Sequence, residues 1–131
     1  MKNKLKLINI ILILTVLLSS CSIYTQKKPN SSYYTELLKK SLSSGQYSGY
    51  ILDTNFYRQE SISPDEILTI KNFLGNISKN NFVKKSPVFN NKPEFRMYIT
   101  FSKEKYIINI YNERYISIFP WDGDFNMDYI D

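Results

Sequence analysis

Apolar side chains recur at helical spacing in two segments of the chain. In residues 32–43 the shared face is formed by Tyr34, Leu37, Leu38 and Leu42, and Gly45 follows where a helix would end. Later, Ser63-Pro64-Asp65-Glu66 combines a capping hydroxyl, a proline at the first helical position and a glutamate that can bond back to the cap. The stripe that follows consists of Ile67, Ile70, Leu74 and Ile77. We predict a short helix and a capped amphipathic helix that ends between Gly75 and Ser78.

Strand-like patterns occupy much of the remaining chain. Residues 47–57 look extended, although Gly49 indicates a bulge or a close approach of another backbone. Residues 80–93 are rich in Asn, Lys and Pro, which is typical of a loop. Three strands are predicted at residues 94–101, 106–112 and 114–119, and their short connections make them antiparallel neighbours. The predicted fold class is α+β: a short N-terminal helix, one strand, the capped helix and a three-stranded antiparallel meander, with the helices packed on the sheet.

The turn lengths predict which side chains share a face of the meander. Pairing Phe101 with Tyr106 and Ile110 with Tyr115 directs one set toward the helices. That set is Phe95, Met97, Ile99, Phe101, Tyr106, Ile108, Ile110, Tyr115 and Phe119. The opposite face would carry Arg96, Tyr98, Thr100, Ile107, Asn109, Tyr111, Arg114, Ile116 and Ile118. This face is more apolar than a solvated face should be, so either the first helix or residues 47–57 cover it, or it binds a partner.

The first 21 residues have the order of a secretory signal. Lys2, Lys4 and Lys6 precede an apolar run over residues 5–18, which is shorter than the roughly 20 residues of a transmembrane helix. Leu18-Ser19-Ser20-Cys21 resembles the lipobox of bacterial lipoproteins. The resemblance implies cleavage before Cys21, a diacylglyceryl group on its thiol and anchoring at the extracytoplasmic face of the cell membrane. An uncleaved anchor with an incidental cysteine is the alternative. The predicted organisation is a signal peptide (1–20), a flexible tether (21–32) and one domain (33–131).

Composition excludes several classes of function. The formal charge of +5 falls to +2 when the three lysines of residues 1–20 are removed, so we predict no nucleic-acid partner. The sequence contains no histidine, and its only cysteine is Cys21. The usual general base, a thiolate nucleophile and the commonest transition-metal ligands are therefore missing. We predict that the protein is not an enzyme and needs no cofactor.

The only tryptophan lies beside several aspartates near the C-terminal end. Asp122, Asp124, Asn126 and Asp128 match the first, third, fifth and seventh oxygen positions of an EF-hand-type loop. Met127 stands where the glycine of that loop belongs, and no bidentate glutamate follows. These four residues are only weak candidates for a calcium site. We predict no metal there and favour a turn after the last strand, with Asp122-Gly123 supplying its chemistry and Trp121 closing the edge of the core. An exposed Trp121 would instead suit a sugar-stacking platform, although buried tryptophans are commoner.

The segment Tyr115-Ile116-Ser117-Ile118-Phe119-Pro120-Trp121-Asp122-Gly123 resembles an uncharacterised family of small lipoproteins from clostridia-like Gram-positive bacteria. The resemblance covers residues 33–131 and implies no activity or functional residue. We predict a lipid-anchored, non-catalytic interaction module of the cell envelope, with a weak calcium- or glycan-binding domain as the alternative. The predicted partners are the membrane, through Cys21, and an envelope protein or wall glycan. The predicted partner face carries Arg96, Tyr98, Tyr111, Arg114, Ile116 and Ile118.

Overall fold

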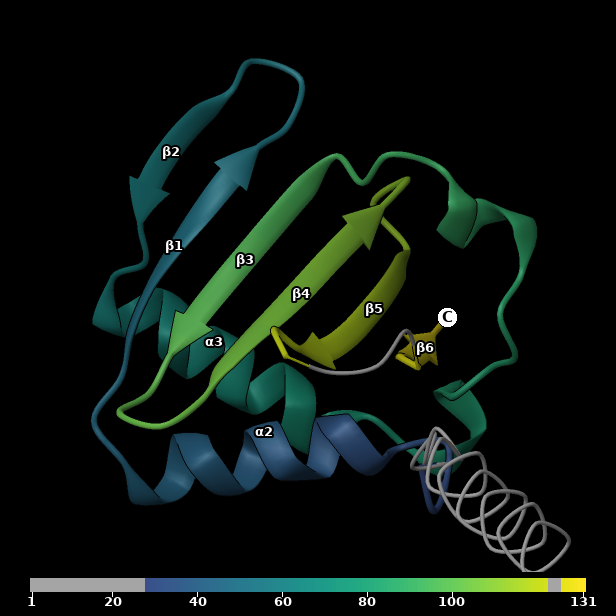
Figure 1. Ribbon diagram of the computed structural model, residues 1–131, viewed down its shortest axis with the longest axis horizontal. Coiled ribbons are helices and arrows are strands. Elements are labelled where there is room, and N and C mark those ends of the chain that lie inside the picture. The colour runs from purple at the N-terminus through teal and green to yellow at the C-terminus, as the bar shows by residue number, and fades with distance from the viewer. Residues whose placement is uncertain (1–27, 123–125) are drawn as a thin grey trace, which may run out of the picture.

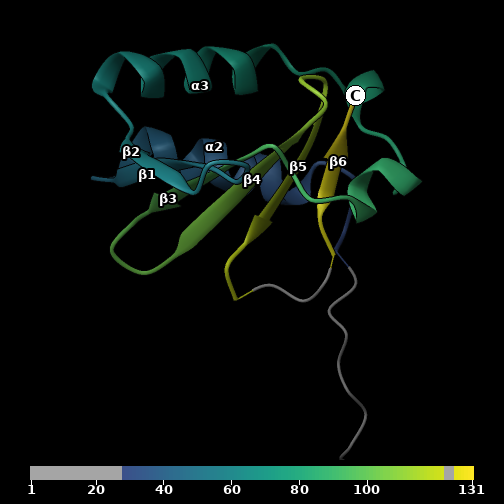
Figure 2. The ribbon, with the colours of Figure 1, turned by 90° about the horizontal axis from the view of Figure 1, so that it is seen from above.

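The computed structural model describes residues 28–122 and 126–131, which form an antiparallel sheet with helices packed on it (Figures 1 and 2). The helices are α2 (Tyr33–Ser44) and α3 (Pro64–Asn76), with two short 3-10 turns, η1 (Lys79–Asn81) and η2 (Pro87–Asn90). The strands are β1 (Ser48–Asp53), β2 (Arg58–Ser61), β3 (Phe95–Thr100), β4 (Lys105–Tyr111), β5 (Tyr115–Pro120) and β6 (Asp128–Ile130). Their order in the sheet is β2-β1-β3-β4-β5-β6. The predicted α+β class is confirmed, whereas the described strands number six and not four.

Both predicted helices are confirmed, and each N-terminus is capped differently. In α3 the capping box is complete, because the Glu66 N–H donates to Ser63 Oγ at 3.3 Å and the Ser63 N–H donates to Glu66 Oε2 at 2.6 Å. In α2, Ser32 makes no side-chain cap bond. Its place is taken by Asp128 of β6, whose Oδ2 accepts the Thr35 N–H at 2.7 Å. The start of α2 is therefore stabilised by a residue of the last strand. None of the described helices has the length and apolar content needed to cross a bilayer.

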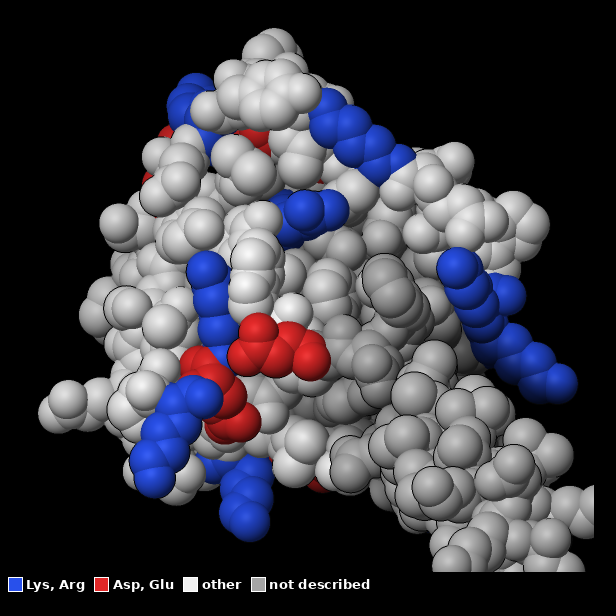
Figure 3. All heavy atoms as spheres, in the orientation of Figure 1, with Lys and Arg blue, Asp and Glu red and all other residues white. Residues whose placement is uncertain are grey.

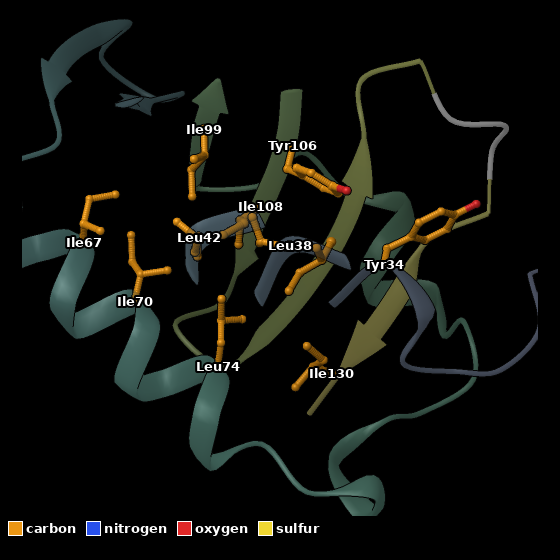
Figure 4. Packing of buried hydrophobic residues seen from close by; sticks show 11 residues of the cluster. Tyr34, Leu38, Leu42, Ile67, Ile70, Leu74, Ile99, Tyr106, Ile108 and Ile130 are labelled. Carbon is orange, nitrogen blue, oxygen red and sulfur yellow. The ribbon is translucent and has the colours of Figure 1, made fainter. Parts of the chain in front are cut away.

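The core lies between the helices and one face of the sheet, called here the inner face (Figure 4). It comprises Tyr34, Leu38, Leu42, Ile67, Ile70, Leu74, Ile99, Tyr106, Ile108, Ile118 and Ile130. Burial of each large aliphatic side chain contributes about 1.5–3 kcal/mol. Short helices of this length are marginal in isolation, so it is this packing that maintains them.

The segment 47–57 is not a lone strand but the first strand and the turn of a hairpin. β1 pairs with β3 on one side and with β2 on the other. Gly49 makes the close approach that its position predicted, since a Cβ there would lie 2.9 Å from the carbonyl oxygen of Tyr98. β2 was not predicted because all four of its residues are exposed and polar.

The predicted faces are confirmed for β3 and β4 and wrong for β5. β3 and β4 pair two positions away from the predicted register, which leaves every side chain on its predicted face. Between β4 and β5, Ile110 faces Ile116 and not Tyr115, a shift of one residue. Asn112 and Glu113 both have positive φ, at 51° and 54°, and Arg114 extends the turn to three residues. The extra residue reverses the faces of β5.

As a consequence, the predicted placement of Ile116 and Ile118 on the partner face is corrected. Ile118 is fully buried in the core, and Ile116 packs against the same cluster. Tyr115 and Phe119 occupy the other side of the sheet, which we call the outer face. Neither predicted cover of that face is found there, because α2 packs in the core with α3 and residues 48–53 belong to the sheet.

Candidate functional site

The outer face is built from four cross-strand rows of side chains, and Figure 1 looks onto it. The first row contains Tyr50, Tyr98, Ile107 and Phe119, which the pairing of four adjacent strands places side by side. The second contains Leu52, Arg96, Asn109, Ser117 and Tyr129. The third is the pair Tyr111 and Tyr115. The fourth contains Ser48, Thr100 and Lys105. Tyrosine occurs in the first three rows, and the charged side chains among the four rows are those of Arg96 and Lys105.

An aromatic cluster, defined here as Tyr50, Tyr98 and Trp121, gathers around the ammonium group of Lys105 at one end of this face. The rings of Tyr50 and Tyr98 stack with centroids 4.6 Å apart, and Trp121 lies 6.1 Å from Tyr98. Lys105 Nζ lies 4.8 Å from the Trp121 ring, 5.0 Å from Tyr98 and 5.9 Å from Tyr50. Burial, and after it the neighbouring Tyr98, raises the pKa of Tyr50, so this phenol stays neutral at physiological pH. The cluster combines three aromatic rings with one lysine ammonium group.

Local backbone bonding positions this cluster. The Trp121 N–H donates to the Lys105 carbonyl at 2.8 Å, which holds the end of β5 against the start of β4. The indole is nevertheless 55% exposed, so the prediction that Trp121 closes the edge of the core is wrong. An exposed tryptophan that contacts other rings offers a flat apolar surface with a polar N–H, the combination enriched in binding sites.

A chain of polar contacts crosses the middle of the outer face. Arg96 Nε donates to Asn109 Oδ1 at 2.9 Å, and Asn109 Nδ2 donates to Tyr111 Oη at 3.3 Å. Tyr111 Oη in turn lies 3.5 Å from Ser117 Oγ. Asn109, Tyr111 and Ser117 are all buried. Buried polar groups that satisfy one another fix side-chain positions, so this network is a structural support for the surface around it.

The far end of the outer face is covered by η2. The Phe89 ring contacts three tyrosines, with centroids 5.5 Å from Tyr111, 5.9 Å from Tyr115 and 4.6 Å from Tyr129. Phe89 itself is buried. This part of the face is therefore a second, small core, and the aromatic cluster at the other end contains the accessible indole.

The predicted partner-face residues are thus divided among three environments. Arg96, Tyr98 and Tyr111 lie on the outer face, with the two tyrosines largely buried. Arg114 lies in the β4–β5 turn, where its guanidinium forms a two-pronged ion pair with the Asp131 carboxylate. Two contributors to the accessible surface, Tyr50 and Lys105, were not singled out from the sequence, since the pairing of β1 with β3 was not predicted.

The four calcium candidates do not share one environment. Asp122 is exposed, Asp124 lies outside the described residues, and Asn126 is exposed. Asp128 faces the core, where Oδ1 accepts from Lys28 Nζ at 3.0 Å and Oδ2 accepts from Thr35. Within residues 28–122 and 126–131, no three acidic, His or Cys side chains gather as a metal site. Cys21 also lies outside the described residues.

Residues 28–32, which were predicted as part of the tether, contact the folded domain. Lys28 binds the carboxylate of Asp128 and also donates to the Met127 carbonyl. Asn30 accepts from the Ser32 N–H at 3.1 Å just before α2 begins. Six residues, 22–27, therefore lie between Cys21 and the first described contact, that of Lys28.

Comparison with known proteins gives a family without an assigned activity. A solved structure of a protein from Clostridium perfringens, provisionally described as a lipoprotein, is similar with a TM-score of 0.70 and 30% sequence identity, covering 79% of this chain and 83% of that one. No curated protein matches the chain. The predicted resemblance to clostridial lipoproteins is confirmed. A family model matches residues 28–131, and the chain belongs to this family, whose description is a domain of unknown function, DUF4883.

Proposed function

We propose that the protein is a lipid-anchored, non-catalytic binding module of the cell envelope that recognises its partner with the aromatic cluster. The anchor is supported by the lipobox at residues 18–21 and by the similarity to the provisionally described lipoprotein from Clostridium perfringens. The observation that carries the binding role is the 55% exposure of Trp121 beside Tyr98 and Lys105. Burial of such an indole in a partner's pocket is the typical centre of a protein interface.

The chemistry of the cluster supports binding over catalysis. Aromatic rings and a lysine ammonium supply contact area, stacking and a fixed positive charge. Proton transfer near neutral pH needs a group that titrates there, and the sequence contains no histidine. The single cysteine is the residue that we assign to the lipid. We therefore propose that the protein holds a partner without transforming it.

A wall glycan is the second candidate ligand, and the exposed indole specifically favours it. A sugar ring can lie flat on an indole that is backed by another ring, while Asp122 and Lys105 could bond to its hydroxyl groups. An envelope protein remains the first candidate because the stacked tyrosines extend the apolar surface from β3 to β1. Calcium binding is not advanced, since both carboxylate oxygens of Asp128 are already bonded.

The partner experiment compares two variants of apolar side chains that are exposed to a similar fraction. Trp121→Ser removes the indole, and Leu68→Ser alters a side chain of α3 that is 56% exposed. Each variant is cross-linked in membranes of the native host, and co-purified proteins and wall fragments are quantified by mass spectrometry. We expect Trp121→Ser to reduce recovery of one specific partner by about tenfold or more, as at an interface hot spot. Equal recovery with both variants would contradict the proposal.

The anchor has its own experiment. Cys21→Ser should abolish incorporation of radiolabelled lipid and release the protein from the membrane fraction, because no other cysteine can be modified. Ser22→Ala, the neighbouring substitution, should leave both unchanged. Lipid incorporation by the Cys21→Ser protein would refute the anchor.

A further inference from the structure

The chain enters the fold at the β6 edge of the sheet. Lys28, the first described residue, bonds to Met127 and Asp128 at the start of β6. Residues 81–83 lie along the same strand, because the Val83 N–H donates to the Tyr129 carbonyl at 2.8 Å and the Asp131 N–H donates to the Asn81 carbonyl at 3.0 Å. Segments from the two ends of the domain and from the loop after α3 thus form one edge.

This edge is basic. Lys79 precedes the segment that runs along β6, and Lys84 and Lys85 follow it directly; all three are exposed. None of them has a carboxylate within ion-pair distance in the described part of the chain. Asp128 in β6 and Asp131 just after it already form ion pairs, with Lys28 and Arg114 respectively. Basic side chains project from the right-hand edge of the molecule in Figure 3.

We infer that this basic edge docks on the anionic headgroups of the membrane that holds the lipid anchor. The inference rests on the proposed lipidation of Cys21. Six residues, 22–27, separate Cys21 from Lys28, and the fully extended chain from Cys21 to Lys28 spans at most about 25 Å. The edge at which the chain enters is therefore kept close to the lipid surface, and its uncompensated charge is complementary to phosphatidylglycerol-type headgroups.

The membrane is favoured as the occupant because the covalent anchor supplies it at high local concentration. Each lysine near an anionic surface raises the ratio of docked to undocked protein roughly fivefold. This attraction extends about one Debye length from the surface. Three lysines acting together would make the docked orientation dominant. The β1–β2 hairpin, whose tip carries exposed Phe56 and Tyr57, forms the edge of the sheet opposite β6 (Figure 1) and would point away from the bilayer.

The test uses the lipidated protein reconstituted in vesicles of phosphatidylcholine with or without phosphatidylglycerol. Asn80→Cys adds a labelling site beside Lys79, and Ser102→Cys adds one in the β3–β4 turn at the opposite end of the sheet. A fluorophore at each site is quenched by lipids that carry a spin label on the headgroup. In anionic vesicles we expect quenching at residue 80 to exceed quenching at residue 102 by about fivefold or more.

Two double variants, each of which removes two lysines, show whether charge causes the difference in quenching between residues 80 and 102. Lys84→Gln with Lys85→Gln, or high salt, should reduce quenching at residue 80 to nearly the value at residue 102. Lys40→Gln with Lys103→Gln should leave the contrast intact. Equal quenching at both sites, or a contrast that survives loss of Lys84 and Lys85, would overturn the docked orientation while leaving the anchor in place. Failure of the protein to float with the vesicles would refute the anchor and the orientation together.

Discussion

Substitution of Asp128 tests whether the last strand stabilises the first helix. The carboxylate is 0% exposed, and it connects Lys28, the start of α2 and β6. Asp128→Ala removes the acceptor of the Thr35 N–H, and loss of such a cap costs about 1 kcal/mol. It also leaves Lys28 without its counter-charge. Because the Lys28 side chain keeps 20% exposure, water can replace part of the lost interaction, and we place this second cost at about 2 kcal/mol, below the full value for a buried pair.

The total of about 3 kcal/mol should lower the midpoint of thermal unfolding by roughly 12 °C or more for a domain of this size. Asp128→Asn should lose less, because its amide oxygen can still accept the Thr35 N–H. Lys28→Met should be as damaging as Asp128→Ala, since it leaves a buried carboxylate unpaired. The double variant Asp128→Asn with Lys28→Met should be more stable than the sum of the single losses predicts.

Urea unfolding followed by far-ultraviolet circular dichroism measures these free energies. Asp122→Ala is the control, because this exposed aspartate lies in the same part of the sequence and should change stability by no more than about 0.5 kcal/mol. If Asp128→Ala and Asp122→Ala unfolded at the same urea concentration, the bonds of Asp128 would contribute nothing to stability and the capping argument would be refuted.

Four further substitutions probe local features of the fold. Gly49→Ala should destabilise the domain by about 1–3 kcal/mol, because its Cβ would press on the backbone of β3. Gly75→Ala should stabilise α3 by about 0.5–1 kcal/mol, because a Cβ there would meet nothing within 4 Å. The same urea assay compares the two variants. Thr35→Val should be neutral or stabilising, since the buried Thr35 hydroxyl has no hydrogen-bond partner among the described residues, and a clear loss of stability would show a partner instead. Hydrogen bonds from the Ser63 backbone and then its side chain lower the pKa of Glu66 below its ordinary 4.5. That stabilisation is present above pH 4.5 and is lost as the pH falls through the lower pKa of the folded state, so Glu66→Gln should be less stable than the parent at pH 7 and equal to it in acid; a difference that persisted in acid would exclude this charge effect.

The elements that could be predicted are those whose signals are local. Ser63, Pro64 and Glu66 specify the start of α3 within four residues, and the stripe of Ile67, Ile70 and Leu74 then forms its buried face. The same holds for β3 and β4, where alternation of apolar and polar residues places the side chains correctly even when the register is two residues off.

The elements that could not be predicted depend on pairing with distant residues. β2 has no apolar position and forms only because β1 offers it a backbone edge. β6 is three residues long and is held by β5 and by Lys28, a hundred residues earlier in the chain. The reversed face of β5 results from one extra residue in a turn whose two positive φ angles belong to Asn112 and Glu113, and neither is a glycine.

The candidate site could be predicted only in part for the same reason. Trp121 and Tyr98 were noticed separately, one as a tail residue and the other on a sheet face. Their meeting with Tyr50 and Lys105 requires the order β1-β3-β4 in the sheet and the bond from the Trp121 N–H to the Lys105 carbonyl. Periodicity reveals which residues share a face of one strand, but it does not reveal which strands become neighbours.

The contact between Lys28 and Asp128 links the stability of the domain to its position at the membrane. If residues 28–32 detached from the domain, Lys28 would leave the buried carboxylate of Asp128 unpaired, at the same cost of about 3 kcal/mol as Lys28→Met. The detached state would therefore be rare, and the stretch that joins Cys21 to the first contact with the domain would stay at six residues. A longer tether would let the domain rotate freely above the bilayer, whereas this one restricts the β6 edge to the neighbourhood of the headgroups. A variant that breaks the Lys28 contact should then lose orientation as well as stability, and the headgroup-quenching contrast between residues 80 and 102 should fall with it.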